Sequence, residues 1–215
     1  MRDIWICGDS TAAVYDSSVT AMVGWGQALE EFLPPARIHN HAMAGRSTKT
    51  FLAEGRLDRL EGEIQPGDLL LIQFGHNDEG DKPERHTEPW ADFTENLKVF
   101  LRFARERSAQ PVLLTPICMR VWQEGRLQPT HGEYLRAVRA LAQAEKVPLI
   151  DLYEESFRLV EEAGEEGSKA LFMHLAPGED PRHPEGSVDN THTRLPAARL
   201  FAAFVARQLE ELRFV

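Results

Sequence analysis

A serine that could act as a nucleophile lies near the N-terminus, in the tetrapeptide Gly8-Asp9-Ser10-Thr11. The apolar residues 4–7 before it predict a buried strand, which would present the Ser10 hydroxyl at the carboxyl edge of a sheet. A serine hydroxyl is a weak nucleophile unless a neighbouring base removes its proton. Taken alone, the tetrapeptide is more typical of a turn or of a helix-capping serine.

A possible base lies near the C-terminus, in the segment Asp189-Asn190-Thr191-His192. An aspartate and a histidine three residues apart can meet on one turn. The carboxylate can then accept the imidazole Nδ1–H, select the tautomer and stabilise an imidazolium formed during catalysis. A loop-capping motif would contain the same residue types, so this segment alone does not indicate catalysis.

Two further segments could donate hydrogen bonds to an oxyanion. Asn77, in Phe74-Gly75-His76-Asn77-Asp78, has a side-chain amide that can donate to developing negative charge. Gly45, in Ala44-Gly45-Arg46-Ser47, allows close approach of its backbone N–H. The ordinary alternatives are an Asx turn at Asn77 and a strand-to-helix turn at Gly45.

The elements that must position these groups alternate along the chain. Short apolar runs predict five strands, at residues 4–7, 36–42, 69–74, 111–115 and 148–152. Amphipathic spacing predicts helices at residues 25–32, 52–64, 90–104, 130–142 and 201–212, the fourth starting with a capping box from Thr130 to Glu133. This alternation predicts one α/β domain over residues 1–215, a flavodoxin-like three-layer sandwich whose five-stranded parallel sheet has helices on both faces.

Two polar segments, residues 75–89 and 174–194, interrupt the alternation. Ligands of open α/β sheets bind at the loops that leave the carboxyl ends of the strands. The serine, glycine and asparagine motifs follow the first three predicted strands, and the Asp-x-x-His motif precedes the last helix. We therefore expect all four motifs at one edge of the sheet.

The order of these motifs resembles that of the SGNH hydrolases, the wider GDSL-type esterase family, from Gly8 to His192. Together with residues 45–49, the segments 8–11 and 74–78 are most similar to the rhamnogalacturonan acetylesterase branch. The chain has no Gly-x-Ser-x-Gly elbow, which counts against an ordinary α/β-hydrolase.

The resemblance implies a role for each motif. Ser10 would be the nucleophile, His192 the base and Asp189 the group that orients it. The backbone N–H groups of Ser10 and Gly45 and the side chain of Asn77 would form the oxyanion hole. The implied reaction removes acetyl groups from a rhamnogalacturonan-type oligosaccharide through an acyl-enzyme, with no metal or organic cofactor.

Residues that could contact such a substrate are either cationic or aromatic. The cationic candidates are Arg46, Lys49, Arg85, Arg120 and Arg126, and the candidates for a sugar-stacking surface are Trp25, Trp122 and Tyr134. From these and the neighbours of Asn77 we select Arg46, His76 and Trp122 as substrate-binding residues. Solvated arginines and core aromatics are the ordinary alternatives.

Other functions stay open at this point. The same chemistry could act on other acyl esters, as in a lipase, or the chain could be a non-catalytic carbohydrate-binding domain on a flavodoxin-like scaffold. His39 and His41 share one strand face and could hold a metal, but without a third ligand we expect simple packing. For Asp78-Glu79-Gly80-Asp81 we expect a solvated loop rather than a calcium site.

The composition excludes several classes of protein. With 24 basic and 34 acidic residues, the formal net charge of −10 argues against binding to nucleic acid or anionic membranes. The sequence shows neither a long apolar stretch nor a signal peptide, which predicts a cytoplasmic location. Cys7 and Cys118 are expected to be buried free thiols, and the oligomeric state is not indicated.

Overall fold

A five-stranded parallel sheet forms the centre of the computed structural model, which describes residues 2–34 and 36–215. The strand order is β2-β1-β3-β4-β7. The strands are β1 (Ile4–Gly8), β2 (Ile38–Asn40), β3 (Leu69–Gln73), β4 (Gln110–Leu114) and β7 (Leu149–Ile150). All five predicted strands are therefore confirmed, with small differences at their ends.

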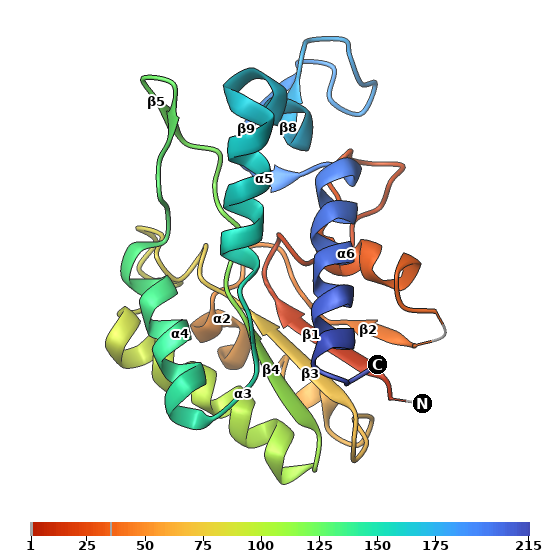
Figure 1. Cartoon of the computed structure of the whole chain (residues 1–215), viewed down its shortest axis with the longest axis vertical. Coiled ribbons are helices and arrows are strands. Elements are labelled where there is room, and N and C mark those ends of the chain that lie inside the picture. The colour runs from red at the N-terminus through yellow and green to blue at the C-terminus, as the bar shows by residue number, and fades with distance from the viewer. Residues whose placement is uncertain (1, 35) are drawn as a thin grey trace.

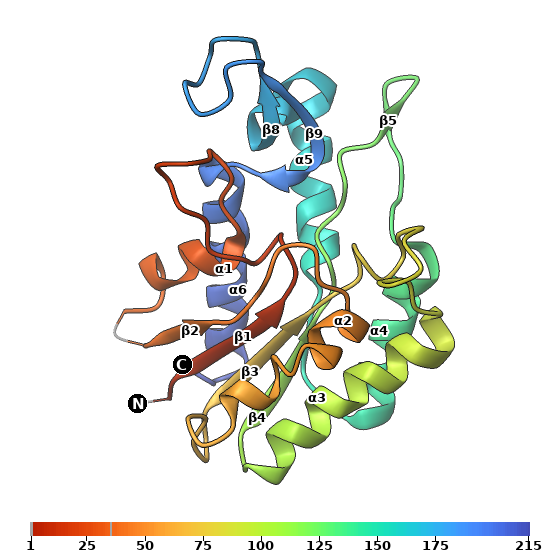
Figure 2. The same ribbon diagram turned by 180° about the vertical axis from the view of Figure 1, so that it is seen from behind.

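Helices cover both faces of this sheet, so the predicted three-layer α/β architecture is confirmed. Figure 1 shows α5 (Leu152–Gly167) and α6 (Leu195–Glu211) in front of one face, and Figure 2 shows α2 (Thr48–Ala53) and α3 (Thr94–Glu106) in front of the other. Successive side chains of a strand point to opposite faces. Accordingly, Ile4 and Ile6 of β1 pack in the core beneath α6, whereas Trp5 and Cys7 pack in the core beneath α3.

The remaining helices agree with the predictions in part. The first predicted helix is α1 (Trp25–Ala28), continued by the 3₁₀ turn η1 (Leu29–Glu31). The third begins with a π-helical turn, η3 (Pro89–Phe93), and continues as α3. Both cysteines are buried and free, as expected. In the described part of the chain, every helix is too short or too polar to cross a membrane.

The prediction of a helix over residues 52–64 is wrong. α2 begins earlier, because the Ser47 side chain accepts the N–H of Thr50 while the Thr50 hydroxyl accepts the N–H of Ser47. It also ends early, since Gly55 adopts a left-handed φ of 62° just after it. The rest of the predicted helix contains only a 3₁₀ turn, η2 (Asp58–Leu60).

The predicted capping box at Thr130 is also wrong. Helix α4 (Gly132–Glu145) begins one residue after His131, which has a left-handed φ of 67°. The hydroxyl of Thr130 accepts the N–H of Met119 instead of capping α4, and Glu133 accepts the indole N–H of Trp90. Both side chains therefore join α4 to neighbouring segments.

Several elements were not anticipated from the sequence. They are the helix α5, the 3₁₀ turn η4 (Ser168–Leu171), the antiparallel pair β8 (Phe172–Leu175) and β9 (Ser187–Thr193), and the hairpin β5 (Trp122–Gln123) and β6 (Arg126–Leu127). The segment predicted as an irregular loop, residues 174–194, thus contains most of an antiparallel ribbon. Figure 1 shows this ribbon and the β5 hairpin beyond the carboxyl ends of the central strands.

Candidate active site

Ser10 lies in a tight turn directly after β1. The Asp9 carboxylate accepts both the backbone N–H and the hydroxyl of Thr11, at 2.9 and 2.8 Å. Thr11 Oγ1 also accepts an amide N–H of Gln73 at the end of β3. The turn is therefore joined to the central strand, and Ser10 is 6% exposed at the carboxyl edge of the sheet.

Asp9 itself is fully buried beneath this turn. Burial raises the pKa of its carboxyl to about 6, although the hydrogen bonds from Thr11 act in the opposite direction. Its second oxygen, Oδ2, has no hydrogen-bond partner within residues 2–34 and 36–215. The Tyr15 hydroxyl closes the turn by donating to the carbonyl of Ser10 at 2.8 Å.

Asp189 and His192 form the contact that their spacing predicts, but in an irregular strand. Between the pairs Met173–Asp189 and Phe172–Thr193, β9 contains residues 190–192, which pair with no residue of β8. In this bulge Asp189 Oδ2 accepts the Nδ1–H of His192 at 2.6 Å. Asp189 Oδ1 accepts the backbone N–H groups of Thr191 and His192 at 2.8 and 3.0 Å.

This arrangement sets the protonation state of both side chains. Burial alone would raise the pKa of Asp189, but the hydrogen bonds from His192 and Thr191 outweigh it and hold the pKa at about 2. The hydrogen bond to Asp189 raises the pKa of His192 above its ordinary value, although burial opposes it. In neutral His192 the proton therefore stays on Nδ1, and Nε2 keeps the lone pair that a base requires.

Hydrogen bonds also join the bulged strand to the segment that follows Ser10. Thr193 accepts the N–H of Val23 at 2.9 Å through its carbonyl and donates its hydroxyl to the Val23 carbonyl at 2.7 Å. Trp25 in turn donates its N–H to the carbonyl of Thr11 at 2.9 Å. Residues 189–193 and the serine turn thus belong to one hydrogen-bonded framework.

In the part of the chain that is described, no hydrogen bond links the Ser10 hydroxyl to His192. Contacts between a nucleophile and its base are often long in a substrate-free enzyme and tighten in the complex. His192 lies close enough to Asp9, the neighbour of Ser10, for its charge to lower the pKa of that carboxyl, so the two segments lie on the same side of the molecule.

Gly45 and Asn77 lie together under the guanidinium of Arg85. Gly45 has a left-handed φ of 77°, and Arg85 Nη2 lies 3.2 Å from the position that a Cβ would take there. Asn77 Nδ2 donates to the carbonyl of Arg46 at 3.1 Å, and Asn77 Oδ1 accepts from Arg85 Nη1 at 3.3 Å. These two contacts orient the amide and leave its second N–H without a partner among the described residues.

Asp78 holds the loops of Gly45 and Asn77 together. It is fully buried, and Oδ1 accepts the N–H of Thr48 at 3.0 Å and the hydroxyl of Thr87 at the same distance. Burial raises the pKa of this carboxyl to about 7 against the hydrogen bonds from Thr48. The expectation of a solvated loop at residues 78–81 is therefore wrong for Asp78, which joins α2 to the loop after β3.

Several of the candidate substrate contacts belong to the interior. Trp25 is fully buried and donates its indole N–H to Gln73, and the Tyr134 hydroxyl donates to the carbonyl of Thr87. Arg120 is buried and donates its Nε–H to Ser168, while its backbone N–H donates to the Asn190 carbonyl at 2.8 Å. Trp25 and Tyr134 therefore follow the alternative of core packing, and of the three aromatic candidates only Trp122 is not buried.

The three residues selected for substrate binding lie in different environments. The guanidinium of Arg46 pairs with Glu54 at 3.0 Å, and its carbonyl is the acceptor that orients Asn77. Trp122 lines a hollow between the β5 hairpin and α5, on the side of Glu161. His76 precedes Asn77, which the sequence predicts to be an oxyanion donor. The roles of all three with substrate stay predictions.

Two groups of histidines bear on metal binding. His39 Nε2 donates to the Asp3 carboxylate at 2.9 Å, and both His39 and His41 stack on Trp5, at 4.0 and 5.5 Å between ring centres. Their arrangement agrees with the expected packing. A different cluster has the residue types and spacing of a metal site, formed by His76, Glu79 and His131. From the sequence, Glu79 is a candidate only as part of a calcium loop, and His131 is not singled out. Because His131 lies 52 residues beyond Glu79, no local motif could have revealed it.

Comparisons with known proteins agree with this arrangement. Residues 6–193 match the GDSL-like Lipase/Acylhydrolase family. The chain is 42% identical to the rhamnogalacturonan acetylesterase RhgT of Bacillus subtilis over 97% of its own length and 90% of that protein. It is 39% identical to the probable rhamnogalacturonan acetylesterase YesY of the same organism, over 97% and 93% of the two chains.

The fold has a similar counterpart among solved structures. The crystal structure of YxiM from Bacillus subtilis matches with a TM-score of 0.82 and 28% identity over 99% of this chain. The match covers 57% of the YxiM chain, so this chain spans little more than half of that protein.

Proposed function

The chain belongs to the GDSL-like lipase/acylhydrolase family, and we propose that it is a serine esterase that removes acetyl groups from a rhamnogalacturonan-type carbohydrate. The 42% identity to RhgT over nearly the whole of both chains supports the carbohydrate acetyl ester as substrate. The observation that best supports the chemistry is the 2.6 Å hydrogen bond between Asp189 and His192, at the same sheet edge as Ser10.

In the first half of the reaction, Ser10 Oγ attacks the carbonyl carbon of the acetyl ester. His192 Nε2 accepts the hydroxyl proton, and Asp189 stabilises the imidazolium that forms. The tetrahedral intermediate then expels the sugar oxygen, which takes the proton from His192 Nε2 and leaves as a hydroxyl. Ser10 now carries the acetyl group.

Negative charge on the carbonyl oxygen needs donors that are already in place. We assign this role to the backbone N–H groups of Ser10 and Gly45 and to the free amide N–H of Asn77. Arg85 supports the role of Asn77 by donating a hydrogen bond to Asn77 Oδ1. This contact keeps the amide nitrogen Nδ2 directed away from Arg85. Its positive charge also favours an anion nearby.

In the second half, water attacks the acetyl carbon of the acyl-enzyme. His192 Nε2 takes a proton from this water and returns it to Ser10 Oγ as the ester bond breaks. Acetic acid and the free serine are the products, and the acid loses its remaining proton to solvent to become acetate. His192 therefore moves one proton in each half of the reaction, and no cofactor is needed.

The central experiment compares wild type with Ser10→Ala on a chromogenic acetate ester and on acetylated rhamnogalacturonan oligosaccharides. Ser10→Ala should lose roughly 10⁴- to 10⁶-fold in kcat. A matched control is Ser17→Ala, an exposed serine of the same loop that should keep full activity. An organophosphonate should label Ser10 alone, and a label on Ser47 would refute the assignment. An inactive wild type that still binds the oligosaccharide would favour a non-catalytic binding domain.

A further inference from the structure

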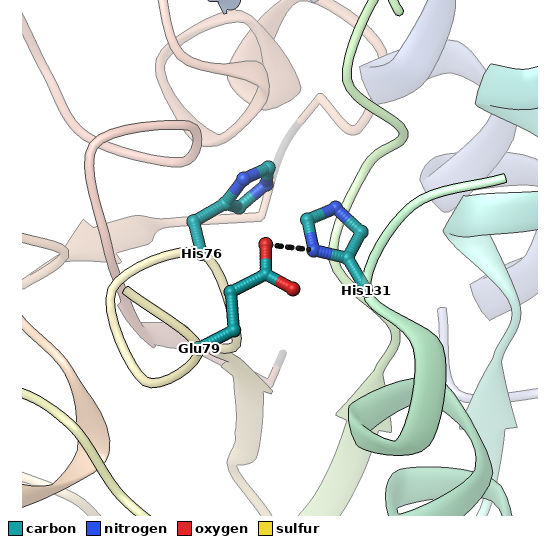
Figure 3. Close-up of side chains that lie close together, drawn as sticks. All are labelled: His76, Glu79 and His131. Atoms are coloured by element: carbon teal, nitrogen blue, oxygen red, sulfur yellow. Dashed lines mark hydrogen bonds and ion pairs between the residues drawn. The ribbon is translucent and has the colours of Figure 1, made fainter. Parts of the chain in front are cut away.

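The side chains of His76, Glu79 and His131 form a compact cluster beside the proposed oxyanion hole. One ligand-type atom from each lies within 4.8 Å of the other two. Figure 3 shows the Glu79 carboxylate between the two imidazoles, with His76 and Glu79 on the loop after β3 and His131 at the start of α4. The cluster therefore bridges two parts of the chain that are distant in sequence.

The hydrogen bonds of His131 define which of its nitrogens is available. Its Nε2 lies 2.7 Å from the carbonyl of Ile117 and must donate a proton to it. In a neutral ring the lone pair is then on Nδ1, which lies 2.7 Å from Glu79 Oε1. Two lone pairs that face each other repel, so this contact needs either a shared proton or a metal ion between Nδ1 and Oε1.

This pattern is the usual one for a histidine that binds a metal. Metal-ligating histidines almost always donate their other ring N–H to a carbonyl, a carboxylate or water, which orients the ring. His131 also has a left-handed φ of 67°, and strained backbone of this kind is concentrated at functional sites.

His76 supplies the second, independent observation. Both of its ring nitrogens are shielded from solvent, and neither has a hydrogen-bond partner among the described residues. Its ring meets that of His131 edge to face at 4.5 Å. A shielded imidazole without a partner is costly unless something binds it.

We propose that His76, Glu79 and His131 together bind one divalent transition-metal ion. Two imidazoles and one carboxylate are the donors that suit Zn²⁺, whose sites with three protein ligands keep a further position open. The ion would neutralise Glu79 and satisfy His76 in one step. It would also tie the loop after β3, which contains Asn77, to the start of α4.

This site goes beyond the proposed function, because the acyl-enzyme route needs no metal. Metal-free protein should therefore still hydrolyse acetate esters, and binding should be measured directly. The full chain is stripped with a chelator and titrated with Zn²⁺ by calorimetry, and with Co²⁺ by visible absorption, which reports tetrahedral coordination. We expect one ion per chain at micromolar affinity or tighter, and a higher melting temperature on binding.

Variants locate the ion. His76→Ala and Glu79→Gln should each weaken metal binding by about 100-fold or more. Loss of a residue that only orients a ligand already costs up to about 100-fold, and these residues would bind the ion directly. Since His76 has no hydrogen bond to lose among the described residues, His76→Ala should fold even if Glu79→Gln does not. His86→Ala is the matched control, because it removes an exposed histidine of the same loop and should bind like wild type.

The outcomes separate this proposal from the proposed function. The same titration on Ser10→Ala should give unchanged metal binding, whatever that variant does to hydrolysis. Wild type that binds neither Zn²⁺ nor Co²⁺ would overturn the metal site and leave only the His131–Glu79 hydrogen bond. Binding that survives in both His76→Ala and Glu79→Gln, with Co²⁺ spectra unchanged, would place the ion elsewhere and overturn the proposal as well.

Discussion

At the scale of single residues, the carboxylate of Asp189 selects the tautomer of His192 that carries its proton on Nδ1. It accepts three hydrogen bonds, two from backbone and one from His192, so its orientation does not depend on the imidazole alone. Other candidate carboxylates are engaged elsewhere, since Asp180 pairs with Arg182 and Asp151 with Arg139. Asp189 is therefore the group whose loss should affect the base.

Asp189→Asn should lower kcat by about 10⁴-fold, because an amide at this position favours the wrong tautomer of His192. The melting temperature should change little, and steady-state kinetics with thermal unfolding checks both. Asp180→Asn is the control. A loss of similar size in Asp180→Asn would contradict the assignment of Asp189.

The raised pKa of His192 makes a prediction about pH and rate. Because His192 must be neutral to accept a proton, kcat/KM should rise with pH through an apparent pKa above the ordinary 6.5. In Asp189→Asn the inflection should move to lower pH, since the hydrogen bond that raises the pKa is lost. A profile that stays flat between pH 5 and 9 would exclude His192 as the base.

The same pair makes a prediction about stability. The pKa of Asp189, lowered from 3.8 to about 2, contributes stability above pH 3.8 that is lost as the pH falls towards 2. The raised pKa of His192 contributes stability that is fully present below pH 6.5. This contribution is lost as the pH rises from 6.5 through the raised pKa of the folded state. The melting-temperature difference between wild type and His192→Ala should therefore be largest between pH 3.8 and 6.5. A difference independent of pH would contradict this linkage.

At the scale of elements, the loop after β3 combines the proposed oxyanion donor Asn77 with Arg85, the residue that orients it. Asp78 joins this loop to the start of α2, so Gly45 and Asn77 keep their relative positions. Arg85 returns from the far end of the loop to contact both. The position of the Asn77 amide therefore depends on residues along the whole loop.

Asn77→Ala should lower kcat by roughly 10²- to 10³-fold with little change in KM, because one oxyanion donor is lost. Arg85→Ala should also lower kcat, and it should add little in the Asn77→Ala background, since it acts through Asn77. Kinetics of the two single variants and the double variant test this. If Arg85 instead contacts an acidic sugar, its effect will appear in KM for charged oligosaccharides and will persist in the double variant.

At the scale of the whole molecule, the surface around the site favours a small acyl group. The loops that flank it, residues 75–89 and 174–194, are polar and charged, and the chain has a net charge of −10. A long acyl chain would find polar and charged side chains there instead of apolar surface that removes it from water, whereas an acetyl group needs only a small recess.

Acetate esters should therefore be hydrolysed much faster than octanoate esters, and acetylated oligosaccharides faster than alkyl acetates. A series of chromogenic esters of increasing chain length measures the first comparison, and acetate release measures the second. Equal or better rates on octanoate would refute the carbohydrate substrate and favour a lipid esterase.

The sequence alone determined the sheet and the positions of the proposed catalytic groups. Apolar runs such as Leu69–Gln73 are local signals, and parallel strands bring their carboxyl ends to one edge, so motifs after the strands must meet there. The short spacing from Asp189 to His192 likewise predicted their contact. Where a local signal competed with another, as at residues 52–64, the prediction was wrong because capping by Ser47 set the start of the helix.

Tertiary structure decided what depends on partners far apart in the chain. The bulge that turns Asp189 towards His192 exists because β9 pairs with β8, and Trp25 is core because Gln73 and the surrounding strands enclose it. The contact of His131 with Glu79 spans 52 residues. Periodicity reports which face of an element is buried, but it contains no information on which distant side chain will lie opposite, and that pairing is what creates the candidate metal site.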